Sequence, residues 1–300
     1  MRFAIFAMLC ASVSGCALPL LKSERLEPRE VLYLKAHEVT DNSGRQDDQS
    51  VDSPSFLSCT TNHDYLVGDS AQPVIATAWP FALMASNSYR TNAQFKVPDW
   101  TLKHHFRGAF NSGYGIAFQA DVYLRGETDK PSEVAIVFRG TDHSVDWLTN
   151  LTMWWPWNED RAPAQYIQAE ALVRWVEKHY RGLRINFVGH SLGGGLAFHV
   201  GWTRQDSRVF AFNTSPRVWA SGEPIQSDRY DIAETGEVLR ALQFWRTLPG
   251  TKTRMNFRSA GLIGDHNMYY FSRAILYQAR KQGDDGAEKA ARLNLGCSAP

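Results

Sequence analysis

The run Ile185-Asn186-Phe187-Val188-Gly189-His190-Ser191-Leu192-Gly193-Gly194 decides how this chain is expected to fold. Its first half reads as a short buried strand and its second half as a glycine-rich helix start. A serine between the two fits the G-x-S-x-G pattern, in which a sharp, strained turn lifts the hydroxyl above the sheet edge. The pattern therefore predicts that Ser191 is a nucleophile. The alternative is a glycine-rich connection that contains an incidental serine.

Strands and helices are expected to alternate on both sides of this run. Helix-like and strand-like patterns follow one another at lengths typical of a parallel sheet covered on both faces. We predict the α/β class, specifically an α/β-hydrolase fold with a mostly parallel central sheet and helices on both faces. The elements expected are helices over 76–89 and 164–180 and strands over 115–124, 133–138, 185–189 and 209–212.

The composition is that of an ordinary globular protein and excludes some partners. The 300 residues are 44% hydrophobic, and 32 basic against 31 acidic side chains give a formal net charge of +1. This balance gives no electrostatic reason to expect a nucleic-acid partner. The sequence contains no H-E-x-x-H motif or cysteine–histidine cluster, so we predict no metal and no cofactor.

The first residues resemble an export signal. A short basic start and an apolar stretch lead into Val13-Ser14-Gly15-Cys16, which resembles a bacterial lipobox. We expect a signal peptide over 1–15, a lipidated Cys16, an N-terminal extension and polar linker over 16–72, and a hydrolase domain over 73–300. The resemblance implies a lipoprotein of the bacterial cell envelope, expected at the outer membrane and facing the periplasm. The alternative is an ordinary signal peptide that is cleaved nearby.

Two cysteines remain for the folded part of an exported chain. Cys59 and Cys297 can pair in an oxidising compartment, and the alternative is two free buried thiols.

Three blocks of sequence resemble the class 3 lipase family, the fungal-type triacylglycerol lipases and their bacterial relatives. The blocks are 187–194 around Ser191, Val137-Phe138-Arg139-Gly140-Thr141 with Asp146-Trp147-Leu148 after it, and 212–218, which departs from the family pattern by one extra residue and by lacking glycines. The resemblance covers roughly 76–276. It implies that the backbone N–H groups of Thr141 and Leu192 form the oxyanion hole.

The remaining triad members are sought downstream of the nucleophile, because this fold orders them as Ser, acid, His. His199 falls within the helix that follows Ser191 and cannot turn back, which leaves His266, in a loop leading into a helix, as the general base. The family pattern around the acid implies Glu237. Other carboxylates also satisfy the chain order, and the main rivals are Asp228 and Asp231, with Glu234 and Asp265 also in range.

A tryptophan-rich segment follows the second block. Trp147, Leu151, Trp154 and Trp155 lie at i, i+4, i+7 and i+8, which places them on one face of a helix. The family resemblance implies a lid that contacts acyl chains or a membrane surface. The alternative is a helix that packs these rings into the core.

These observations predict a serine ester hydrolase that cleaves carboxylic esters of lipids through an acyl-enzyme. Its expected partners are a lipid or ester substrate and the membrane, reached through Cys16 and the tryptophan-rich segment. A phospholipase or thioesterase on the same scaffold, or a non-catalytic envelope lipoprotein that keeps the fold, is the alternative.

Overall fold

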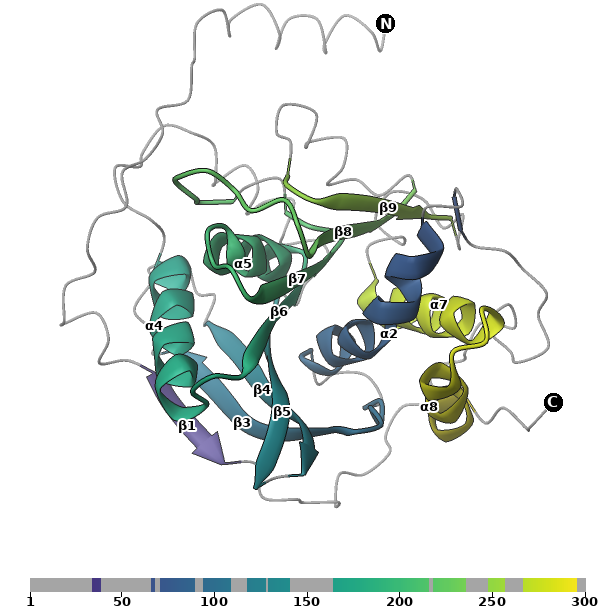
Figure 1. The fold of residues 1–300 in the computed structure, drawn as a ribbon, viewed down its shortest axis with the longest axis horizontal. Helices are drawn as coiled ribbons and strands as arrows, with labels where there is room; N and C mark the ends of the chain where they lie inside the picture. Colours follow the sequence, from purple (N-terminus) through teal and green to yellow (C-terminus); the bar gives the residue numbers. More distant parts are fainter. Residues whose placement is uncertain are drawn as a thin grey trace, which may run out of the picture.

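The computed structural model describes residues 34–38, 66–67, 71–89, 94–108, 118–127, 129–140, 164–215, 218–235, 248–256 and 267–295. These residues form one sheet flanked by helices (Figure 1). The described strands are β1 (Leu34–Glu38), β2 (Leu66–Val67), β3 (Trp100–Gly108), β4 (Gln119–Glu127), β5 (Lys130–Phe138), β6 (Arg184–His190), β7 (Ser207–Phe212), β8 (Arg229–Glu234) and β9 (Thr251–Met255). The described helices are α2 (Gln72–Asn87), α4 (Ala164–His179), α5 (Leu192–Gly201), α7 (Met268–Lys281) and α8 (Asp285–Leu295).

The strand order is β1-β3-β4-β5-β6-β7-β8-β9-β2. Strands β5 to β9 are parallel, whereas β1, β3 and β4 on one side and β2 on the other are antiparallel to their neighbours. The connections β5–α4–β6 and β6–α5–β7 each advance one strand in the same direction. Because such crossovers share one hand, α4 and α5 lie on the same face of the sheet.

Both faces of the sheet are buried. Along β6, Phe187 belongs to the core under α4 and α5, and the next residue, Val188, belongs to the core under α2, α7 and α8. Strands covered on both faces have nearly continuous apolar runs, which is what the sequence shows here. The predicted α/β class, with a parallel centre and helices on both faces, is therefore confirmed.

Two short strands from the predicted N-terminal extension join the sheet. β1 pairs antiparallel with β3, and β2 pairs antiparallel with β9. They supply the two outermost strands of the described sheet. The division into an extension over 16–72 and a domain over 73–300 stays a prediction.

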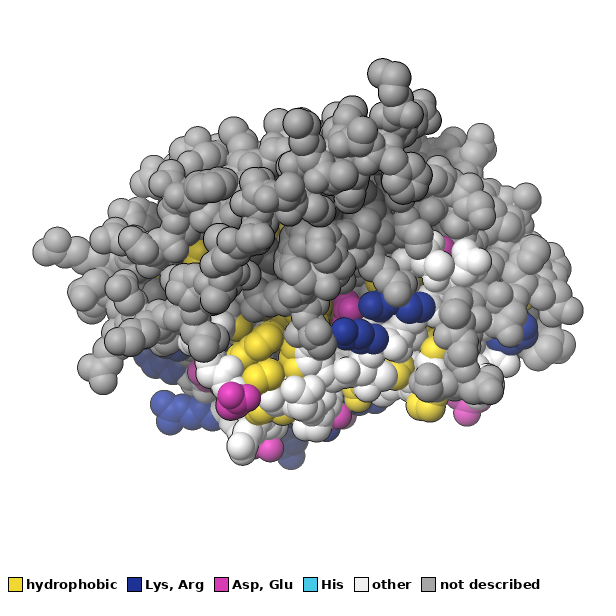
Figure 2. Space-filling model, turned by 90° about the horizontal axis from the view of Figure 1, so that it is seen from above, with side chains coloured by type: hydrophobic (Ala, Val, Ile, Leu, Met, Phe, Trp, Pro, Cys, Tyr) yellow, Lys and Arg dark blue, Asp and Glu magenta, His cyan; other side chains and the backbone are white. Residues whose placement is uncertain are grey.

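The described surface carries charges of both signs. On the face seen in Figure 2, hydrophobic, basic and acidic side chains lie beside one another among the described residues. Within the same ranges, no helix has both the length and the apolar composition needed to cross a membrane.

Candidate functional site

Ser191 lies on the turn between β6 and α5, where the sequence predicted it. Its backbone has φ 58° and ψ −123°, a region that costs a non-glycine residue about 1–3 kcal/mol. The turn is held by hydrogen bonds: the Ser191 N–H donates to the Phe212 carbonyl at 3.0 Å, and the Ser191 carbonyl accepts from the N–H groups of Gly194 and Ser215, each at 3.0 Å. The end of β7 and the first turn of α5 therefore fix the strained conformation.

Glycines allow the close approach of the three segments around Ser191. A Cβ on Gly189 would lie 2.1 Å from the carbonyl oxygen of Gly193, and a Cβ on Gly193 would lie 2.1 Å from the carbonyl oxygen of Phe138. Neither position can accept a larger residue without a backbone shift. The glycines of the motif therefore set how tightly α5 packs on the ends of β5 and β6.

The segment after β5 passes directly beside the nucleophile. A Cβ on Gly140 would lie 3.1 Å from the Ser191 Cβ and 2.5 Å from the His190 carbonyl oxygen. Thr141, the next residue, lies outside the described residues. Leu192 is the first residue of α5, so its N–H belongs to the helix N-terminus, where donors lack intrahelical partners and the dipole favours negative charge. The arrangement leaves Ser191 between a helix N-terminus and the chain that leads to Thr141.

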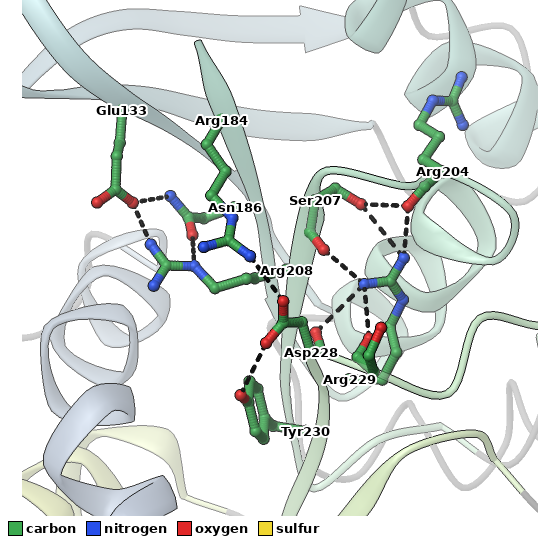
Figure 3. A network of polar contacts seen from close by, with 10 residues as sticks. Glu133, Arg184, Asn186, Arg204, Ser207, Arg208, Asp228, Arg229 and Tyr230 are labelled. Carbon is green, nitrogen blue, oxygen red and sulfur yellow. Dashed lines mark hydrogen bonds and ion pairs between the residues drawn. The ribbon is translucent and has the colours of Figure 1, made fainter.

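The candidate acids of the triad differ in how close they lie to Ser191. β8 runs parallel to β6. Asp228 precedes β8 whereas Ser191 follows β6, so Asp228 lies at the amino ends of the parallel strands and Ser191 at their carboxyl ends. Figure 3 shows Asp228 there, accepting from Arg184 at 2.6 Å and from the Tyr230 hydroxyl at 3.2 Å. Asp228 therefore lies away from Ser191 and is bound to other side chains.

Asp231 lies inside β8 and has other partners. It is 1% exposed, accepts from the Thr214 hydroxyl at 3.0 Å and forms an ion pair with Arg254 at 3.3 Å. Glu234 is the last residue of β8, so it lies at the carboxyl ends of the strands, as Ser191 does, and it is 0% exposed. Its N–H donates to the Asn213 side chain at 2.8 Å, which fixes the end of the strand. Sequence reasoning placed Glu234 in range by order alone, without a sign of this burial.

His199 is excluded as the base by its contacts as well as by its place in α5. Its Nδ1 is hydrogen-bonded to the Trp219 carbonyl, and its Nε2 lies 3.5 Å from Glu170. Burial lowers its pKa to about 4, and although Glu170 opposes this shift, Arg204 adds to it. His199 is therefore neutral in the folded protein near pH 7.

This buried histidine gives a pH dependence of stability. The folded pKa lies below the unfolded value, so the unfolded state binds the proton first as the pH falls. The contribution is fully present above about pH 6.5 and is lost as the pH falls toward 4. Between pH 7 and pH 5 the free energy of unfolding should fall by about 2 kcal/mol more in the wild type than in His199→Gln. Urea denaturation at the two pH values measures this, and equal losses in both proteins would contradict it.

Several predicted residues lie outside the described residues and stay predictions. They are Cys16, Cys59, Thr141, Trp147, Leu151, Trp154, Trp155, Glu237, His266 and Cys297. The surroundings of His266 are partly described, since α7 begins at Met268 and Asn267 caps it by accepting from the Tyr269 N–H at 3.0 Å. The prediction that a helix follows His266 is confirmed. Within the described part of the chain, no group of three or more His, Cys, Asp or Glu residues could hold a metal ion.

One family model matches the middle of this chain, and a solved structure is similar to it at a low score. Residues 90–215 match the family model of a Tle-like phospholipase domain, described as phospholipase-like. The crystal structure of the Lip2 lipase from Yarrowia lipolytica is similar at a TM-score of 0.40 and 13% identity, over 63% of this chain and 81% of that one. No curated protein matches the chain. The matched stretch holds β3 to β7, Gly140 and Ser191, and it supports a lipase-like relationship for this part of the chain.

Proposed function

We propose that this chain is a serine hydrolase that cleaves carboxylic esters of lipids through an acyl-enzyme. The observation that carries the proposal is the strained turn at Ser191, which sits on the N-terminus of α5 and against Gly140. A packed strand-to-helix connection does not need a positive φ at a serine, and such strain is typical of a nucleophile held above the carboxyl ends of the strands.

The reaction proceeds in two steps. His266 takes the Ser191 proton as the hydroxyl oxygen attacks the ester carbonyl, and the N–H groups of Thr141 and Leu192 stabilise the tetrahedral oxyanion. The intermediate collapses, and the alcohol leaves with the proton from His266. Water, deprotonated by His266, then attacks the acyl-enzyme, and the acid is released as Ser191 recovers its proton.

We assign the acid that orients His266 to Glu237, with Glu234 as its rival. Glu237 fits the family pattern. Glu234 is buried at the carboxyl ends of the strands, where Ser191 also lies, and its strand is two strands from β6. Glu237→Gln and Glu234→Gln, assayed side by side, separate them. The change that removes the partner of His266 should lower kcat at least about 100-fold, because the imidazolium loses its stabilising charge. If only Glu234→Gln has this effect, the assignment to Glu237 is wrong.

A phospholipid is the substrate that the family match favours. The matched model is that of a phospholipase-like domain, whereas the class 3 resemblance points to triacylglycerols. The proposed lipid anchor at Cys16, an exported location and the tryptophan-rich segment 147–155 as a lid are consistent with either substrate in a membrane.

The proposal is tested by labelling the purified protein with a fluorophosphonate and mapping the modified peptide. Rapid labelling at Ser191 is expected, because an unactivated serine reacts slowly. Release of fatty acid from a diacyl phospholipid, a triacylglycerol and an acyl thioester, measured in parallel, then assigns the substrate class. A folded protein that neither labels nor releases fatty acid would overturn the proposal in favour of a binding lipoprotein.

A further inference from the structure

Tyr89 is a residue that the proposed reaction does not yet use, and it contacts the nucleophile turn from another part of the chain. It follows α2, and its N–H donates to the Ser86 carbonyl at 3.2 Å. The Tyr89 hydroxyl and Nδ1 of His190 share a hydrogen bond of 2.5 Å, with the two rings edge-on at 5.5 Å. His190 is 4% exposed and directly precedes Ser191.

The same hydroxyl lies against the segment that leads to Thr141. A Cβ on Gly140 would lie 2.5 Å from the Tyr89 oxygen and equally close to the His190 carbonyl oxygen. The tyrosine therefore meets both the end of β6 and the segment following β5. Gly140 precedes Thr141 in the chain and His190 precedes Ser191, so one hydroxyl contacts the residue next to each of these two predicted site residues.

The ring of Tyr89 is itself held in place. The Arg139 guanidinium lies over it, 5.7 Å from the ring centroid, and Arg139 donates to the Gln119 side chain at 2.6 Å. Gln119 begins β4, and its carbonyl also accepts from the Arg139 N–H at 3.0 Å. The hydroxyl is thus presented to His190 by a side chain fixed from a third strand.

We propose that Tyr89 is a positioning residue that holds the turn at Ser191 at a fixed distance from the backbone at Gly140. It acts through His190 and Gly140 and transfers no proton. The inference rests on the proposed function, because it requires Ser191 to be the nucleophile. Small errors in this geometry are costly, since a misplacement of about 1 Å reduces rates by around 100-fold.

The test is a Tyr89→Phe variant, which keeps the ring beneath Arg139 and removes only the hydroxyl. We expect kcat on a p-nitrophenyl ester to fall about tenfold while KM changes less than about twofold, because substrate binding is retained and the reacting atoms are misplaced. Rates are counted per active site titrated with a fluorophosphonate, so that misfolded protein does not contribute. Tyr180→Phe is the matched control, since Tyr180, the residue after α4, shares a similar 2.6 Å hydrogen bond with His104 of β3, away from Ser191.

A double-mutant cycle with His190→Phe gives the second readout. Because the hydroxyl acts through both His190 and Gly140, each single change should lower kcat, and the double variant should lose less than the product of the two single losses. A loss equal to that product would show that the hydroxyl does not act through His190. An unchanged kcat in Tyr89→Phe, or a loss of the same size in Tyr180→Phe, would overturn the inference while leaving the serine hydrolase intact. A wild-type protein that neither labels nor turns over would instead overturn the proposed function.

Discussion

Ser191→Ala should lower kcat for ester hydrolysis by roughly 10³- to 10⁶-fold while the protein stays folded. The methyl group cannot attack a carbonyl, so acyl-enzyme formation stops and only the oxyanion hole and substrate binding remain to accelerate the reaction. Alanine meets the same backbone strain at φ 58° as serine, and the hydrogen bonds that hold the turn are made by backbone atoms. The free energy of unfolding should therefore change by less than about 1 kcal/mol.

The measurement is hydrolysis of a short and a long p-nitrophenyl ester, with urea denaturation of the same preparations. Ser227→Ala is the matched control, because Ser227 is exposed and precedes β8, at the end of the parallel strands opposite to Ser191. It should retain wild-type activity. Substantial activity in folded Ser191→Ala would show that a different residue performs the chemistry, and the triad would be withdrawn.

The elements around Ser191 could be predicted because their signals are local. The continuous apolar run of β6 reflects burial on both faces of the strand, the glycines after it reflect close packing of the turn, and the amphipathic pattern of α4 reflects burial on one face of the helix. The acid of the triad was harder to predict around β8, because the order of residues along the chain does not show which of them lie at the same end of the strands as Ser191. Asp228 and Glu234 both lie between Ser191 and His266 in the chain. They lie at opposite ends of β8, and only Glu234 is at the end where Ser191 lies.

Contacts between segments far apart in sequence could not be predicted. β3 carries two adjacent histidines that break an apolar pattern, and the sequence gives no strand signal there. In the structure, His104 meets Tyr180, and His105 bonds to Asp121 across the β3–β4 pair at 2.6 Å. The hydrogen bond between Tyr89 and His190 is of the same kind. Each is satisfied by a partner that no periodicity identifies.

At the end of the parallel strands opposite to Ser191, a buried arginine connects β8 to α5 and to the segment before β7. Arg229 begins β8, is 1% exposed and lies within the polar network of Figure 3. Its guanidinium donates to the carbonyls of Gly201 at 2.7 Å, Arg204 at 2.6 Å and Ser207 at 2.6 Å. Gly201 ends α5, where the helix dipole favours a cation. Burial lowers the pKa of Arg229, and the charge of Asp228 opposes that shift.

Arg229→Met should therefore lower the free energy of unfolding by about 3–5 kcal/mol, because the thioether fills similar space and leaves buried carbonyls without their donor. Arg229→Lys should recover part of the loss, since an ammonium keeps the charge but cannot reach all three carbonyls in a fork. Arg184→Met is the control: Arg184 also belongs to the network, but its pair with Asp228 is exposed by 44% and 39%, and its loss should cost less than about 1 kcal/mol. Urea denaturation at pH 7 ranks the three variants. If Arg229→Met were no less stable than Arg184→Met, the carbonyls at the end of α5 would have to find other donors, and the buried arginine would not be what joins α5 to β8.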